Sequence, residues 1–137
     1  MLFPKKVKYR KWQRLRKKNP GVETRGISLA FGSYGLKAMT AGEITSQQIE
    51  ASRKVMSRFV QKTGKLWIRV FPDRAVTKKP PEVKMGKGKG DPVGFMFRAR
   101  RGRIIFEIDG LKKDLAEKAL RGAGAKLAIK TKIVSRE

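Results

Sequence analysis

The stretch that decides the fold is "TSQQIEASRKVMSRFVQK" at residues 45–62, which has the strongest helical pattern in the chain. Thr45 precedes Gln48 by three residues, a spacing typical of a capping box at the start of a helix. An apolar stripe follows at helical spacing and consists of Ile49, Met56, Phe59 and Val60, with the small Ser52 between them. Basic residues lie away from this stripe: Arg53, Lys54, Arg58 and Lys62. We expect the stripe to be core, and the basic face to be either solvated or a contact surface for a partner.

Shorter patterns around this helix predict strands. Residues 26–38 alternate apolar and small side chains, which predicts a strand, a turn at 32–35 and a second short strand. Residues 65–71 alternate in the same way and predict another strand. Residues 75–83 contain two consecutive prolines, which exclude a central strand, so we expect an extended entry into the loop that follows.

The C-terminal part of the chain predicts a hairpin, a helix and a last strand. Residues 94–101 and 103–109 alternate around a single glycine, which favours a hairpin. Residues 110–122 predict a second helix with Asp109 as its N-cap, and residues 126–134 predict the last strand. The second helix is expected to turn four apolar side chains inward: Leu111, Leu115, Ala119 and Leu120.

The order of these elements, β-β-α-β-loop-β-β-α-β, predicts an α+β fold. We expect a single compact domain in which two helices pack on one mixed β-sheet. This domain spans residues 26–137, and a basic extension at residues 1–25 precedes it. A loop at residues 80–94 is expected to project from it.

The composition excludes several classes of function. Lys and Arg number 35 against 11 Asp and Glu in 137 residues, a formal net charge of +24. Charge of this size favours a polyanionic partner, with nucleic acid the first candidate and an anionic membrane surface the second. The chain has no Cys and no His, and no apolar run approaches the ~18 residues that span a bilayer. We expect a cytoplasmic protein with no catalytic residue, metal, cofactor, small-molecule substrate or membrane partner.

The first 25 residues carry ten basic side chains and a single acid, Glu23, so they cannot fold alone. Either they are a solvated tail, or they are an arm that becomes ordered on a phosphate backbone with Tyr9 and Trp12 stacking on bases. The basic residues are Lys5, Lys6, Lys8, Arg10, Lys11, Arg14, Arg16, Lys17, Lys18 and Arg25.

Residues 84–90 read K-M-G-K-G-K-G. A nucleotide-binding Walker loop needs Ser or Thr directly after its Lys, but Gly88 follows Lys87, and the dinucleotide pattern fails as well. Glycines allow close approach to a phosphate backbone, and lysines supply charge, so the loop is either a cationic finger for RNA or an exposed hairpin tip. The candidate residues are Lys84, Met85, Gly86, Lys87, Gly88, Lys89 and Gly90.

Three other functions remain as alternatives at this point. Glu107 and Asp109 are close together and could hold a metal in a nuclease. A general nucleic-acid-binding or chromatin protein would also be basic, although no helix-turn-helix, zinc-finger or RRM pattern is present. A cationic membrane-surface protein would need a basic amphipathic helix with aromatic anchors, which is missing. Because the basic residues are spread over several elements, the sequence favours a protein embedded in folded RNA.

Several segments resemble the bacterial-type ribosomal protein L-sixteen family of the large subunit, in order along nearly the whole chain. They are "KYRKWQR" in the basic extension, "FGSYGLKA" at 31–38, "ITSQQIEASRKVMSR" at 44–58, "KLWIRVFPDRAVTKKP" at 65–80, "VKMGKGKGDP" at 83–92 and "IKTKIV" at 129–134. The pair "WIRVFPD" and "MGKGKG" is highly specific. More distant relatives of this family are the archaeal and eukaryotic L-ten-e proteins.

The resemblance implies an α/β-hammerhead-type fold and a place in the large subunit of a cytoplasmic or organelle ribosome. It implies binding to large-subunit rRNA, contact with A-site tRNA and as a weaker implication P-site tRNA, neighbouring ribosomal proteins, and a part in late subunit assembly. Residues 84–90 would then point towards the peptidyl transferase region. Many relatives have an Arg that can be hydroxylated where this chain has Lys84, so that modification does not carry over. With rRNA as the partner, the basic extension with its aromatic residues and the basic helix face are expected to make the rRNA contacts, through Lys5, Lys6, Lys8, Tyr9, Arg10, Lys11, Trp12, Arg14, Arg16, Arg53, Lys54 and Arg58.

Overall fold

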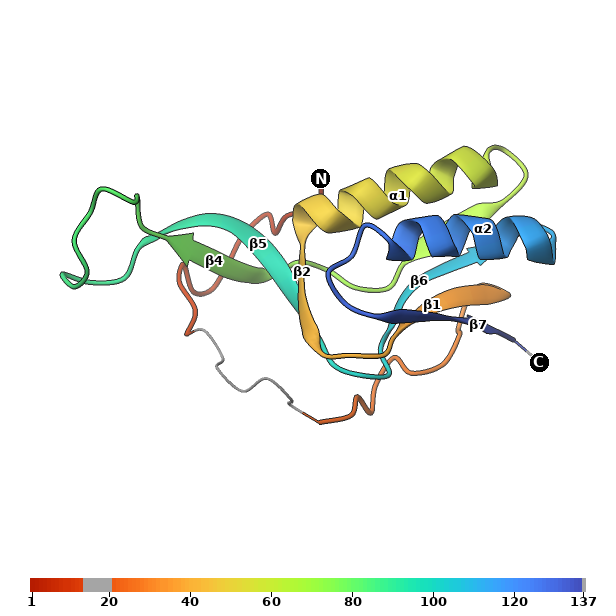
Figure 1. Ribbon diagram of the computed structural model, residues 1–137, viewed down its shortest axis with the longest axis horizontal. Coiled ribbons are helices and arrows are strands. Elements are labelled where there is room, and N and C mark those ends of the chain that lie inside the picture. The colour runs from red at the N-terminus through yellow and green to blue at the C-terminus, as the bar shows by residue number, and fades with distance from the viewer. Residues whose placement is uncertain (14–20, 137) are drawn as a thin grey trace.

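The structure is a computed structural model that describes residues 1–13 and 21–136 (Figure 1). In these residues two helices and seven strands follow one another in an α+β arrangement, which confirms the predicted class. Their bounds are β1 Tyr34–Ala38, β2 Gly42–Thr45, α1 Ser46–Val60, β3 Lys65–Ile68, β4 Arg74–Lys78, β5 Asp91–Ala99, β6 Ile104–Asp109, α2 Lys113–Gly124 and β7 Thr131–Ser135.

The strands form two antiparallel sheets and not the single mixed sheet that was expected. One sheet has the order β3-β6-β1-β7, and the other has the order β2-β5-β4. In the four-stranded sheet Leu36 lies opposite Phe106 on β6 and opposite Ile133 on β7. Two of these three side chains are buried and Ile133 is half-buried, so the centre of this sheet is also the centre of the core.

Both helices cover one face of the four-stranded sheet, while residues 21–33 cross its other face (Figure 1). The helices are joined to each other by a buried hydrogen bond of 3.0 Å from Ser52 Oγ to the carbonyl oxygen of Ala123. Every residue of the run Ile104–Ile108 in β6 is buried, because this strand is covered on both faces.

The first helix confirms its prediction closely. Thr45 is the N-cap, its side chain accepts from the backbone N–H of Gln48, and the Gln48 side chain accepts from the N–H of Thr45. Ile49, Ser52, Met56 and Val60 are buried, as the stripe predicted, and Phe59 is half-buried. The helix ends at Val60, four residues before the glycine that was expected to end it.

The hairpin predicted for residues 94–101 and 103–109 does not exist. These segments are β5 and β6, and each belongs to a different sheet, so the turn between them connects two sheets. The strand predicted at residues 26–31 is also wrong. This segment is not in a strand, and β1 begins at Tyr34, inside the predicted turn. The short β2 was missed because four residues before a helix give too weak an alternation.

The second helix begins at Lys113 and not after Asp109. Its N-cap is Lys112, which makes no capping hydrogen bond through its side chain. Ala119 and Leu120 are buried as predicted, but Leu115 is 43% exposed. The shifted start brings other side chains inward, and the buried face of α2 consists of Ala116, Ala119, Leu120 and Ala123.

The β4 and β5 strands form a long hairpin that projects from one end of the molecule, away from the helices (Figure 1). β4 is an edge strand of its sheet, consistent with the exclusion of a central strand by the prolines that follow it. Residues 79–90 form the loop at the tip of this hairpin. Neither described helix is long and apolar enough to cross a membrane.

Candidate nucleic-acid interface

The loop at residues 79–90, here called the finger, has a backbone that only glycine-rich sequence adopts easily. Gly86, Lys87 and Gly88 have φ angles of 97°, 59° and 102°, all in the left-handed region. A Cβ atom added to Gly86 or Gly88 would meet nothing within 4 Å, so these glycines are needed for conformation and not for space. The Lys79 ammonium donates to the carbonyl oxygen of Gly86, which folds the finger back on its own base.

The finger presents its cationic side chains to solvent. Residues 81–89 are all exposed, and Met85 at the tip is 95% exposed. The lysines of this run are Lys84, Lys87 and Lys89. At the base of the finger, a Cβ atom on Gly90 would lie 2.8 Å from the backbone carbonyl carbon of Lys78. Gly90 therefore allows the two strands to approach each other where the finger begins.

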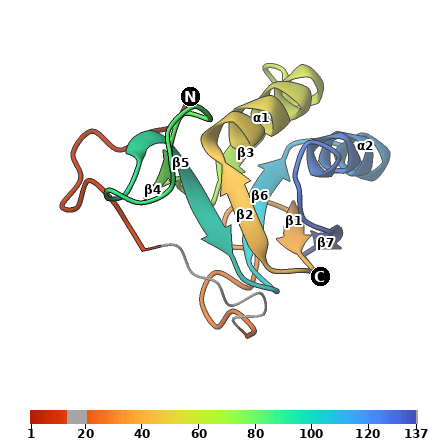
Figure 2. The same ribbon diagram turned by 60° about the vertical axis from the view of Figure 1, so that its left-hand side comes forward.

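The first part of the basic extension, residues 1–13, lies along the base of the finger. Lys11 Nζ donates to the carbonyl oxygen of Lys89 over 3.0 Å, and lies 4.0 Å from an oxygen of Asp91. A guanidinium nitrogen of Arg10 lies 3.5 Å from the same oxygen of Asp91. Figure 2 shows this segment beside β4 and β5. Residues far apart in the sequence thus form one basic surface, which we call the arm–finger surface.

The aromatic residues of the extension contact the protein itself. The Arg74 guanidinium lies over the ring of Trp12 at 4.9 Å, and Trp12 packs edge-on against Tyr9 with ring centroids 6.3 Å apart. Lys8 in turn lies 5.5 Å from the Tyr9 ring centre. Trp12 is still 39% exposed and Tyr9 57% exposed, so both rings keep accessible surface for a base.

The other basic candidates are spread over the molecule. Lys5, Lys6 and Lys8 are exposed in the extension, whereas Arg14 and Arg16, with Lys17 and Lys18, lie outside the described residues. On α1, Lys54 and Arg58 are exposed.

Arg53 is the one basic candidate on α1 with a strong internal partner among the described contacts. It forms an ion pair of 2.5 Å with Glu50, one turn earlier, and its hydrogen bond lowers the pKa of Glu50. The positive charge of Arg53 is therefore largely balanced within the helix, whereas Lys54, Arg58 and Lys62 of the predicted basic face are exposed.

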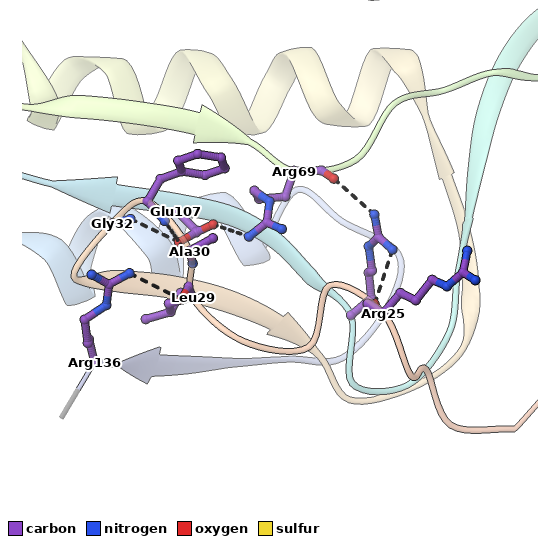
Figure 3. A network of polar contacts seen from close by, with 9 residues as sticks. Arg25, Leu29, Ala30, Gly32, Arg69, Glu107 and Arg136 are labelled. Atoms are coloured by element: carbon purple, nitrogen blue, oxygen red, sulfur yellow. Dashed lines mark hydrogen bonds and ion pairs between the residues drawn. The ribbon is translucent and has the colours of Figure 1, made fainter.

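Glu107 anchors the segment that crosses the sheet (Figure 3), and Asp109 anchors it as well. One oxygen of Glu107 accepts from the backbone N–H groups of Ala30, Phe31 and Gly32 at 2.9, 3.0 and 3.0 Å. Its other oxygen accepts from Arg69 at 2.5 Å. Burial alone would raise the pKa of Glu107, but the hydrogen bonds from Gly32, Arg69 and the neighbouring N–H groups outweigh it and lower the pKa.

Asp109 binds the same segment further along. It accepts 2.8 Å hydrogen bonds from Ser33 Oγ and from the backbone N–H of Gly110. These two bonds, followed by the charges of Arg136 and Lys65, lower the pKa of Asp109. Asp109 is therefore a structural anchor and not the helix cap that was predicted.

These contacts leave little room for the metal-dependent nuclease alternative. Glu107 has 0% exposure and accepts four hydrogen bonds, so its oxygens are already occupied. Within the part of the chain that the structure describes, no group of three or more acidic, His or Cys side chains is placed to hold a metal.

The anchoring network extends through arginines that sequence reasoning did not single out. Arg103 donates to the carbonyl oxygens of Arg25 and Arg69, both at 3.3 Å, and Arg136 donates to that of Leu29 at 3.3 Å. The signal that could have revealed part of this network is the acid inside "IIFEID": a charge between apolar residues of a buried strand needs a partner.

The family of the chain follows from a comparison of its whole length. A family model described as ribosomal protein L16p/L10e matches residues 4–134. The chain belongs to this family. An L16p/L10e protein is a structural, RNA-binding constituent of the large ribosomal subunit and acts in translation, in the cytoplasm or in an organelle, together with rRNA and other ribosomal proteins. The basic surfaces described above are therefore surfaces of a ribosomal protein.

Proposed function

We propose that the arm–finger surface is the main contact of this L16p/L10e protein with large-subunit rRNA, and that the finger also contacts A-site tRNA near the peptidyl transferase centre. P-site tRNA contact and support of late subunit assembly are further parts of this proposal. The observation that carries it is the docking of residues 1–13 on the base of a finger that exposes Lys84, Lys87 and Lys89.

The internal contacts of this surface are weak enough to yield to RNA. The pair between Arg10 and Asp91 has side chains that are 72% and 80% exposed, and such pairs contribute only about 0–1 kcal/mol. Phosphates can therefore take the place of Asp91 at little cost.

The division into an extension at residues 1–25 and a body at residues 26–137, with the loop at 80–94 as the projecting part, belongs to the same proposal.

The test removes charge from the finger and, as a matched control, from α2. The finger variant changes Lys84, Lys87 and Lys89 to Ala, and the control variant changes three exposed lysines of the α2 region to Ala: Lys112, Lys113 and Lys118. Large subunits are reconstituted with each variant, and binding of A-site tRNA is measured. We expect reduced tRNA binding with the finger variant and unchanged binding with the control.

Binding of an rRNA fragment at several salt concentrations supplies the second measurement. Each lost phosphate contact reduces the slope of log affinity against log salt by about 0.7–0.9, so the finger variant should have a shallower slope than the control. Circular dichroism should show both variants folded, because the substituted side chains are exposed. Equal tRNA binding and equal slopes for the two variants would refute the proposed role of the finger.

A further inference from the structure

A second aromatic pair lies on the four-stranded sheet, which is not the sheet that carries the finger. The rings of Phe31 and Trp67 are stacked, with centroids 5.9 Å apart and planes inclined by 19°. The Arg69 guanidinium carbon lies 5.3 Å from the centre of the Phe31 ring. Phe31 nevertheless keeps 56% of its surface exposed. A large ring with this exposure is a candidate contact for a partner.

The position of Phe31 is fixed by its backbone. Its N–H donates to Glu107 over 3.0 Å, and the N–H groups on either side donate to the same oxygen. A Cβ atom on Gly32 would lie 2.6 Å from the carbonyl oxygen of Ile108, so the segment is held against β6. Trp67 and Arg69 project on the same side of the chain at the edge strand β3 and its continuation. The buried Glu107 therefore fixes the backbone that carries the exposed ring, and the stack on Trp67 orients the ring.

The surroundings of this pair are basic. Lys65 is exposed on β3, two residues before Trp67, and Arg136 is exposed beside the segment that carries Phe31. Of the two acids nearby, Glu107 is fully buried and paired with Arg69, and Asp109 offsets part of the charge of Lys65 and Arg136. The two cations therefore still outnumber the one accessible carboxylate. A flat aromatic surface with flanking cations complements a base and its phosphates better than it complements an apolar protein surface.

We propose that Phe31 and Trp67 form a stacking site for an unpaired base of the large-subunit rRNA, separate from the arm–finger surface. The base stacks on the exposed ring of Phe31, which is itself stacked on Trp67, and Lys65 and Arg136 contact the adjoining phosphates. This inference rests on the proposed binding of rRNA. It adds a second RNA-facing surface, on the sheet face opposite the helices.

The test compares Phe31→Leu, which keeps an apolar side chain without a ring, with Phe31→Tyr, which keeps the ring. Phe71→Leu is the matched control, since Phe71 is another exposed aromatic residue, at 42%. The probes are an oligoadenylate RNA of about eight nucleotides, within the usual length of a single-strand site, and the same RNA paired with its complement. Affinities are measured at one fixed salt concentration.

We expect Phe31→Leu to lose about 5- to 150-fold in affinity for the single strand, the usual cost of one lost base–aromatic stack. The affinity of Phe31→Leu for the duplex should stay near the wild-type value. The affinities of Phe31→Tyr and of Phe71→Leu for both probes should also stay near the wild-type values. In a Trp12→Phe background Trp67 is the sole tryptophan, and the single strand should quench its fluorescence.

Three results would overturn the stacking site. The first is an unchanged affinity of Phe31→Leu for the single strand. The second is an equal loss of affinity for the single strand and the duplex. The third is normal RNA binding by Phe31→Leu combined with poor incorporation into large subunits, which would assign this surface to a protein neighbour. Absence of wild-type binding to any rRNA fragment would instead refute the proposed function itself, so the two failures are distinguishable.

Discussion

Replacing Glu107 with Gln tests whether Glu107 anchors residues 21–33, the segment that crosses the four-stranded sheet. Gln keeps one oxygen, which can still accept from the N–H groups of Ala30, Phe31 and Gly32. The oxygen that accepted from Arg69, however, is replaced by an NH2 group, so two hydrogen-bond donors face each other there. Arg69, whose side chain is 20% exposed, then loses its charged partner in a mostly dry site.

The magnitude follows from these contacts. Hydrogen bonds to charged groups contribute about 1.5–3 kcal/mol each, and breaking a fully buried ion pair costs about 3–5 kcal/mol. Because Arg69 is partly solvated and three acceptor contacts are kept, we expect a loss of about 2–3 kcal/mol. For a domain of this size that corresponds to a decrease in Tm of roughly 10 °C.

The assay is urea denaturation at neutral pH, with Glu82→Gln in the exposed loop as the matched control. The control should stay within about 0.5 kcal/mol of the wild type, as surface substitutions usually do. The double variant Glu107→Gln with Arg69→Gln should recover part of the loss, because no unpaired charge is left. A Glu107→Gln protein as stable as the control would refute the view of Glu107 as an anchor.

The same contact predicts how stability depends on pH. The pKa of Glu107 is lower in the folded protein than in the unfolded chain, where it is about 4.3. Its contribution is therefore complete above that unfolded value and is lost as the pH falls through the folded pKa. Below about pH 4.3 the wild-type protein should lose stability more steeply than Glu107→Gln does.

Two further substitutions test local features of the fold. Thr45→Ala removes the N-cap of α1 and should cost about 1 kcal/mol, measured by urea denaturation. Gly90→Ala places a methyl group 2.8 Å from the backbone of Lys78 and should cost about 1–3 kcal/mol. Gly94→Ala, at a φ outside the left-handed region, meets nothing within 4 Å and should change the Tm little. Equal Tm values for the two glycine variants would contradict the close approach at Gly90.

Local features were predictable because their partners are close in sequence. The capping box joins residues three positions apart, and the buried stripe of α1 repeats at the helical period. The glycines of the finger are a comparable case. Their alternation with lysine indicated a flexible cationic loop, and the structure places Gly86 and Gly88 in the left-handed region.

Pairing of strands was less predictable because alternation shows that a strand exists but not what it pairs with. The segments before and after Gly102 are neighbours in sequence, yet β5 joins one sheet and β6 the other. The missing strand at residues 26–31 has a related cause. Its backbone N–H groups at Ala30 and Phe31 bond to a side chain, Glu107, and not to a neighbouring strand.

The sequence by itself determined the α+β class, the first helix with its cap, the basic character and the ribosomal family, because these depend on composition, short-range spacing and motifs. Only the tertiary structure decided that Lys11 contacts the finger across 78 positions, and that Glu107 binds a segment 75 to 77 positions away. Such contacts depend on which surfaces meet once the core has formed. No local sequence pattern around Lys11, Phe31 or Glu107 specifies which distant residue each of them contacts.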